Sequence, residues 1–230
     1  EDFFDLTVAR PSVHLDHEGS RHIAWPSTSV YAAHVPETDH DLVVLTGHEP
    51  QLRWRTFVDH VLTTANEVGA SLAVTLGALL TDVPHTRPVQ VYGTSDDVVI
   101  TEHLSLSPST YEGPTGIVGV LGAGLRAAGI PTASLWASVP AYVSSAPSPK
   151  AALALVEGLS TVLGTTIPCT DLEIAAATYE RQVSDLVAED EDTAEYVERL
   201  EVDFDEEPDD NPDRLVADIE DFLRNQPGKP

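Results

Sequence analysis

Short apolar segments alternate with longer segments of helical periodicity along most of this chain, and this alternation limits its fold more than any other feature. The clearest strand candidate is the run 42–47, which is continuously apolar, as is typical of strands buried on both faces of a parallel sheet. Further strands are expected at 30–35, 71–80, 89–93 and 132–139. The spacing of apolar residues predicts helices over 52–68, 116–128, 149–163, 171–200 and 213–224.

Strands separated by helices of this length are typical of βαβ units. The expected fold class is therefore α/β, a three-layer α/β/α domain with a mostly parallel sheet over residues 1–168. Residues 169–230 are expected to form a helical C-terminal region that contains an acidic linker near 201–213. Ser148 followed by Pro149 predicts the start of the helix over 149–163, since serine is a good N-cap and proline fits the first helical position.

Charge excludes two classes of partner. The 230 residues include 38 acidic and 12 basic side chains, a net charge of -26, so nucleic acids and anionic membranes are not expected to bind. Residues 171–230 alone carry 21 acidic and 5 basic side chains. The acidic stretch is either a solvated linker or a tail that docks on a basic protein partner. No apolar run approaches the roughly 20 residues that span a bilayer.

The single cysteine, Cys169, excludes an intrachain disulfide and favours a cytoplasmic protein. It is either a structural cysteine or, at a helix start, a thiol of lowered pKa. The His14–His22 segment matches no closed zinc pattern and is expected to be a surface hairpin. No nucleophile elbow is present. Catalytic residues, metals and cofactors are assigned as none.

Ligands of open α/β sheets bind beyond the carboxyl ends of the strands, so the loops that follow the strands are the candidate site. After the strand at 42–47 come Glu49 and Arg53, which either face a cleft or, for Glu49, favour a helix dipole. After the strand at 71–80, two prolines stiffen a loop that presents His85 and Arg87. These two residues either bind an anion or a carboxylate, or cap their neighbours in an ordinary turn.

Two further loops complete the candidate site. Thr115 and Gly116 precede a helix whose free amides could hold an anion, although Thr115 as a simple N-cap is the alternative. This loop is not a GxGxxG or P-loop signature. Tyr142 follows the last strand and either lines the same cleft or packs in the core.

Three segments resemble the proteasome assembly chaperone 2 family in its actinobacterial branch. They are Gly47-His48-Glu49-Pro50-Gln51-Leu52-Arg53-Trp54, Val83-Pro84-His85-Thr86-Arg87-Pro88 and Ala137-Ser138-Val139-Pro140-Ala141-Tyr142. The resemblance implies a domain similar to purine nucleoside phosphorylases, homo-oligomers with a trimer among the candidate states, and no established enzymatic reaction. Family members begin with a further strand and a Gly-aromatic-x-Asp-Ala-Gly loop, so we expect this sequence to lack an N-terminal strand–loop–helix unit.

Two functional hypotheses follow. The first is a non-enzymatic oligomeric protein with an assembly or scaffolding role and a protein partner. The second is an enzyme or small-ligand binder with an anion-binding cleft at the carboxyl edge of the sheet. The sequence favours the first, because it contains no recognisable pair of nucleophile and base.

Overall fold

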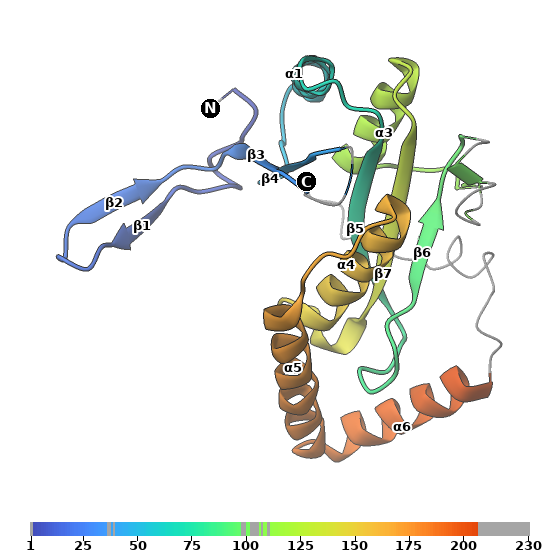
Figure 1. The fold of residues 1–230 in the computed structure, drawn as a ribbon. Coiled ribbons are helices and arrows are strands. Elements are labelled where there is room, and N and C mark those ends of the chain that lie inside the picture. The colour runs from blue at the N-terminus through green and yellow to red at the C-terminus, as the bar shows by residue number, and fades with distance from the viewer. Residues whose placement is uncertain are drawn as a thin grey trace.

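The computed structural model describes residues 2–206 except 36–37, 39, 98–99, 102–105, 107 and 110. Within this range the chain has an α/β fold (Figure 1). Its strands are β1 (Ser12–Leu15), β2 (Arg21–Ala24), β3 (Thr28–Ala33), β4 (Leu42–Gly47), β5 (Ala73–Thr81), β6 (Val91–Thr94) and β7 (Thr132–Pro140). Its helices are α1 (Trp54–Glu67), α3 (Ile117–Ala127), α4 (Pro149–Leu163), α5 (Thr170–Ala188) and α6 (Glu191–Glu206), with a short 3₁₀ turn η1 (Ala141–Val143). None of the described helices is long and apolar enough to cross a bilayer.

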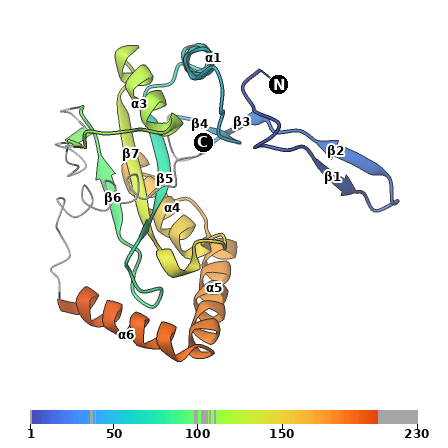
Figure 2. The same ribbon diagram turned by 180° about the vertical axis from the view of Figure 1, so that it is seen from behind.

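The sheet that organises the helices consists of β5, β7 and β6 in that order. Ala137 of β7 packs against Ala151 of α4, whereas Thr132 of the same strand lies against Gly122 of α3. Because odd and even residues of a strand point to opposite faces, α4 and α3 cover opposite faces of this sheet, as Figures 1 and 2 both show. A separate core cluster of Phe57, Val58 and Ile117 joins α1 to α3.

The expectation of a mostly parallel sheet does not hold for the described residues. β5 and β7 are parallel, but β6 is antiparallel to β7, and β3 is antiparallel to β4. The reason is the connection after β5, which is a short loop without a helix. A strand that runs parallel to the one before it needs a long crossover that returns the chain to the starting end of the sheet. Without such a crossover, the chain passes beyond β7 and β6 runs in the opposite direction to both β5 and β7.

Strand β4 forms at the predicted residues, but its predicted burial is wrong. It pairs with β3 in a two-stranded sheet, and Val43, Val44 and Leu45 are each at least 38% exposed. The apolar run correctly predicted a strand, because β-branched and aliphatic residues favour extended backbone. Burial of both faces requires neighbouring layers, and the described residues provide none for this sheet.

The long helix expected over 171–200 is two helices, α5 and α6, with a break at Glu189 and Asp190. Asp190 is the reason for the break. Its carboxylate accepts hydrogen bonds from the backbone N–H of Asp192 (3.1 Å) and the hydroxyl of Thr193 (2.8 Å), so it starts a new helix. The acidic linker expected from residue 201 is also wrong as far as Glu206, because these residues are helical; residues 207–213 and the helix expected at 213–224 lie outside the described range.

The start of α4 confirms its local sequence signal. The hydroxyl of Ser148 accepts a hydrogen bond from the backbone N–H of Ala151 at 3.2 Å, and Pro149 occupies the first turn. The helix ends at Gly164, whose φ of 62° is left-handed and therefore suits glycine. These capping residues set where α4 begins and ends, and Lys150 in its first turn lies beside the loop that follows β5.

Candidate functional site

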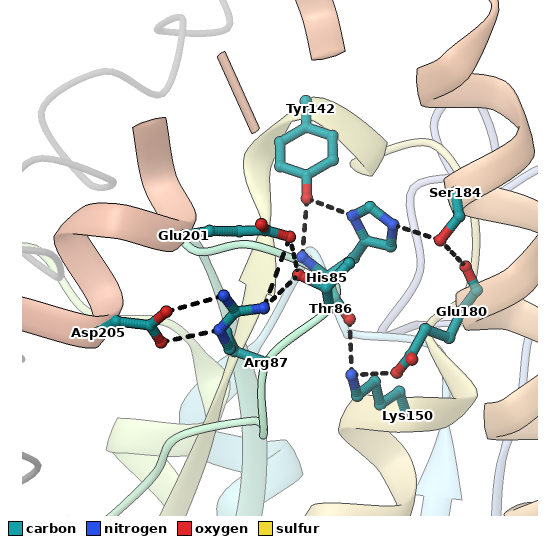
Figure 3. A network of polar contacts seen from close by, with 9 residues as sticks. All are labelled: His85, Thr86, Arg87, Tyr142, Lys150, Glu180, Ser184, Glu201 and Asp205. Carbon is teal, nitrogen blue, oxygen red and sulfur yellow. Dashed lines mark hydrogen bonds and ion pairs between the residues drawn. The ribbon is translucent and has the colours of Figure 1, made fainter. Parts of the chain in front are cut away.

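The most specific sequence motif, Pro84-His85-Thr86-Arg87-Pro88, lies in the loop between β5 and β6, where it meets η1, α4, α5 and α6. Figure 3 shows the polar network around it. We call this network the clasp; its members are His85, Thr86, Arg87, Tyr142, Lys150, Glu180, Ser184, Glu201 and Asp205. The clasp lies at the carboxyl ends of β5 and β7, the edge of the sheet at which the sequence predicted a ligand site.

His85 is the centre of the clasp and is only 4% exposed. Its backbone N–H donates to the phenol oxygen of Tyr142 at 2.8 Å, and its ring Nδ1 lies 2.8 Å from the same oxygen. Its ring Nε2 lies 2.9 Å from the hydroxyl oxygen of Ser184. That hydroxyl donates its own proton to the backbone oxygen of Glu180 at 2.9 Å.

This chain of hydrogen bonds favours one neutral tautomer of His85. The hydroxyl of Ser184 has one proton, and when it donates that proton to Glu180, Nε2 of His85 carries a hydrogen and donates it to Ser184. Nδ1 is then the acceptor, and the O–H of Tyr142 donates to it. This arrangement is a neutral imidazole with a partner for each ring nitrogen, whereas a charged ring would donate to both of the same oxygens.

The charges around His85 favour the same neutral form. Burial lowers the pKa of His85, the ammonium group of Lys150 lowers it further, and Glu180 and Glu201 oppose the shift. Burial also raises the pKa of Tyr142 to about 12, so its hydroxyl stays protonated and can donate.

Lys150 connects the loop to both neighbouring helices. From the first turn of α4, its ammonium group donates to the backbone oxygen of His85 at 2.6 Å and forms an ion pair with Glu180 of α5. A single side chain thus links the loop, α4 and α5.

Arg87 connects the loop to α6. Its Nε and Nη2 donate to the two carboxylate oxygens of Asp205, each at 2.8 Å, and this pairing raises the pKa of Arg87 and lowers that of Asp205. Glu201, one helical turn earlier, accepts from Thr86 and lies 3.6 Å from Arg87. Two acids at i and i+4 share one face of α6, and here that face meets the loop.

Aromatic contacts extend the clasp on the same side. The ring of Tyr142 packs edge-on against the rings of His85 and Tyr196, with centroid distances of 6.0 Å in both cases. The hydroxyl of Tyr196 donates to the carboxylate of Asp82 at 2.9 Å. The loop therefore holds α6 by apolar as well as polar contacts.

Of the seven residues predicted from the sequence, the structure brings His85, Arg87 and Tyr142 together. Their partners on α4, α5 and α6 were missed, because a single sequence does not show which helix packs on which loop. The spacing of Glu201 and Asp205 was the one available signal, since two acids on one helix face suit an arginine. The assignment of a ligand to these residues stays a prediction, and the structure gives their polar groups partners within the protein.

The other four predicted residues lie apart from the clasp. A carboxylate oxygen of Glu49 accepts from the backbone N–H of Ile117 at 3.4 Å, so Glu49 sits at the start of α3. Gly116, rather than Thr115, is the N-cap of that helix. Arg53 pairs with Asp2 at 2.7 Å on the surface. No hydrogen bond or ion pair within the described part of the chain joins these residues to His85 or Arg87.

Two buried hydroxyl groups also lie at the carboxyl ends of the parallel strands. Thr81 of β5 and Ser138 of β7 are 5% and 1% exposed, and their side-chain oxygens have no hydrogen-bond partner among the described residues. In the parallel register Ser138 pairs with Leu79, two residues before Thr81, so both hydroxyls lie on the face opposite α4. A buried hydroxyl without a partner is unfavourable, which leaves this edge able to accept a polar group.

Cys169 is accessible but lacks the lowered pKa of a reactive thiol. It precedes α5, is partly exposed, and its thiol donates to Glu173 at 3.7 Å. Burial and the nearby carboxylates of Glu173 and Glu157 raise its pKa, so the lowered pKa considered from its place at a helix start is not found.

Comparison with known proteins identifies the architecture. The family model that matches is that of the PAC2 family, over residues 1–187. A PAC2 family protein from Streptomyces avermitilis is 45% identical over 85% of this chain and 83% of its own, with a TM-score of 0.76. A proteasome-assembly chaperone homologue from Mycobacterium tuberculosis is 40% identical over 86% of this chain and 84% of its own, with a TM-score of 0.74.

A third structure, a Mycobacterium tuberculosis protein of unknown function, is 26% identical over 97% of this chain and 76% of its own, with a TM-score of 0.83. No curated protein is significantly similar to the chain. The resemblance found from the three sequence segments is confirmed, and the matched range includes the clasp loop, η1, α4 and most of α5. The chain belongs to the PAC2 family.

Proposed function

We propose that this protein is a non-enzymatic, oligomeric member of its family that acts by protein–protein contact, as an assembly or scaffolding factor in the cytoplasm. One observation carries the proposal: the polar side chains of the most specific motif join the sheet to α5 and α6. His85, Arg87 and Lys150 each contact a C-terminal helix through hydrogen bonds or ion pairs. The motif therefore holds α5 and α6 in a fixed orientation against the sheet. This role fits a protein that presents a binding surface better than an enzyme that needs these side chains for catalysis.

The relatives indicate a class of partner. The Mycobacterium tuberculosis protein at 40% identity is described as a proteasome-assembly chaperone homologue. By extension we propose that unassembled proteasome subunits are the partners of this chain. Partner binding through the ordered helices α5 and α6 would depend on the clasp, because Arg87 and Glu201 hold α6 against the loop.

Two measurements test this proposal. Light scattering after size-exclusion chromatography should show an oligomer at micromolar concentration, and native electrophoresis should show a complex with purified, unassembled proteasome subunits of Mycobacterium tuberculosis. The variant Arg87→Ala should weaken the complex, while the surface control Arg55→Ala should leave it unchanged. A monomer that binds no subunit contradicts the proposal, and a subunit complex that is insensitive to Arg87→Ala contradicts the role assigned to the clasp.

A second candidate function is favoured by the hydroxyls of Thr81 and Ser138. We propose it as the alternative: a small polar ligand binds at the carboxyl edge of β5 and β7 and supplies their hydrogen bonds. Thermal unfolding with and without added phosphate or small carboxylates tests it, with Ser138→Ala as the comparison. A ligand that raises the melting temperature of the wild type but not of Ser138→Ala supports the alternative, and equal responses contradict it.

A further inference from the structure

A β-hairpin projects from the body of the protein in both views (Figures 1 and 2). It consists of β1 and β2, which pair in antiparallel register from Ser12↔Ala24 to Leu15↔Arg21. The turn is well defined, because the carboxylate of Asp16 accepts from the backbone N–H groups of Glu18 and Ser20 at 2.9 and 2.8 Å. We call residues 10–25 the arm.

The arm has one apolar face. Val13 pairs with Ile23 on this face, and Leu15 lies two residues further along the same face, where its partner is Arg21. The exposed Trp25 follows directly after the end of β2. Their exposed fractions are 56% for Val13, 60% for Ile23, 64% for Leu15 and 49% for Trp25. Together these side chains expose on the order of 400 Å² of apolar surface, a size at which exposed patches mark interaction sites.

The opposite face of the arm is polar. His14 pairs with His22, whose ring lies 2.8 Å from the carboxylate of Asp16. A two-stranded hairpin is marginally stable in water on its own, and this one extends away from the body with its apolar face uncovered. The division into an apolar and a polar face indicates that the apolar face packs against another surface.

A matching surface exists on the same chain. The sheet formed by β3 and β4 contains no charged residue, and Val30, Tyr31, Val43, Val44 and Leu45 are all exposed on it. Val30 and Leu45 are registered partners and lie on one face. The apolar side chains of the arm can therefore pack on this sheet, while Arg21, at the tip end of the same face, stays at the edge of the contact.

We propose that the arm of one copy packs its apolar face against the β3–β4 sheet of a second copy. The inference rests on the proposed function in one respect, since it assumes that the chain self-associates. Each contact between an arm and a sheet covers on the order of 400 Å² on either side. A two-fold arrangement contains two such contacts and therefore buries on the order of 1,600 Å² in total, the standard size of a stable interface. One arm on an unrelated protein buries on the order of 800 Å², which is the size of weak contacts.

The distribution of charge supports a second copy as the occupant. With a net charge of -26, copies of this chain repel one another over most of their surfaces. In the arm, Arg10 and Arg21 balance Asp16 and Glu18, and β3 and β4 carry no charge. The arm and this sheet are thus surfaces on which two acidic copies can meet without charge repulsion at the contact.

Fluorine NMR of protein labelled with 5-fluorotryptophan tests the proposal without altering the fold. The chain has three tryptophans, and Trp25 is assigned by the resonance missing from Trp25→Phe. The Trp25 resonance should shift with protein concentration and lose its sensitivity to H₂O/D₂O exchange as oligomers form. The resonances of Trp54 and Trp136, which lie in the body, should not change.

Variants measured by light scattering complete the test. Ile23→Ser combined with Trp25→Ser should convert the oligomer to monomer, as should Val30→Ser combined with Leu45→Ser, whereas His14→Ser on the polar face should leave the mass unchanged. An oligomer whose Trp25 resonance does not respond, or that persists in either double variant, overturns this inference and leaves the proposed function standing. A wild-type protein that stays monomeric at all concentrations overturns both.

Discussion

Lowering the pH below about 6.5 should destabilise this protein through His85. Burial is the largest cause of its lowered pKa, followed by the charge of Lys150. A second ring proton would sit on Nδ1 and point at the Tyr142 oxygen, which already accepts the backbone N–H of His85. The proton of Tyr142 would then lose its acceptor, so protonation disrupts the clasp.

The sign and size of the effect follow from linkage. A histidine whose pKa is lowered on folding stabilises the native state above its unfolded pKa, and that contribution is lost as the pH falls towards the folded pKa. Between these two values the unfolded chain binds more protons at this histidine than the native chain, by one proton at most. The free energy of unfolding should therefore fall as the pH drops through this range, and His85 contributes a slope of at most about 1.4 kcal/mol per pH unit.

Urea unfolding between about pH 5 and pH 7.5 measures this slope for the wild type and for His85→Gln. Glutamine keeps an N–H donor for Ser184 but does not titrate, so the slope attributable to His85 should disappear. His17→Gln is the matched control, because His17 is exposed, while His85 is the only buried histidine in the described part of the chain. Parallel pH profiles for the wild type and His85→Gln would refute the assignment of a neutral, clasped imidazole.

Arg87→Lys should speed hydrogen exchange in α6 but not in α3, as mass spectrometry will show, because lysine cannot donate two parallel bonds to Asp205. Ser148→Ala should lower the free energy of unfolding by about 1 kcal/mol in urea titrations, since it removes the N-cap of α4. Gly158→Ala should raise the melting temperature, because its methyl group meets Leu135 at an ordinary 3.5 Å and alanine favours a helix by about 1 kcal/mol. Gly124→Ala should lower it, because there the methyl group would lie 2.7 Å from Val58.

Local signals in the sequence predicted most elements and some of their ends. Ser148 and Pro149 mark the start of α4 because capping depends only on neighbouring residues. The same locality explains two errors. Asp190 was not recognised as a cap inside an apparently continuous periodic segment, and the acids from Glu201 onward were interpreted as a linker. Glu201 is in fact paired with Thr86 and Arg87, which lie more than a hundred residues earlier in the sequence.

The candidate site was predicted in part for a similar reason. The motif containing His85 and Arg87 was identified because prolines and polar side chains together mark a rigid loop. What the loop contacts depends on α5 and α6, about a hundred residues later, and no periodicity encodes that contact. The strand β4 shows the same limit, since its apolar run predicted the extended backbone but not the absence of covering layers.

By itself the sequence determined the α/β class, the positions of most strands and helices, the large negative charge and the PAC2 family, because these depend on composition, periodicity and short motifs. Only the tertiary structure decided the direction of β6, the exposure of β4, the neutral tautomer of His85 and the pairing of Arg87 with α6. These properties arise from contacts between residues that are far apart along the chain. Such contacts are selected by the free energy of the whole packed molecule, and no single segment contains them.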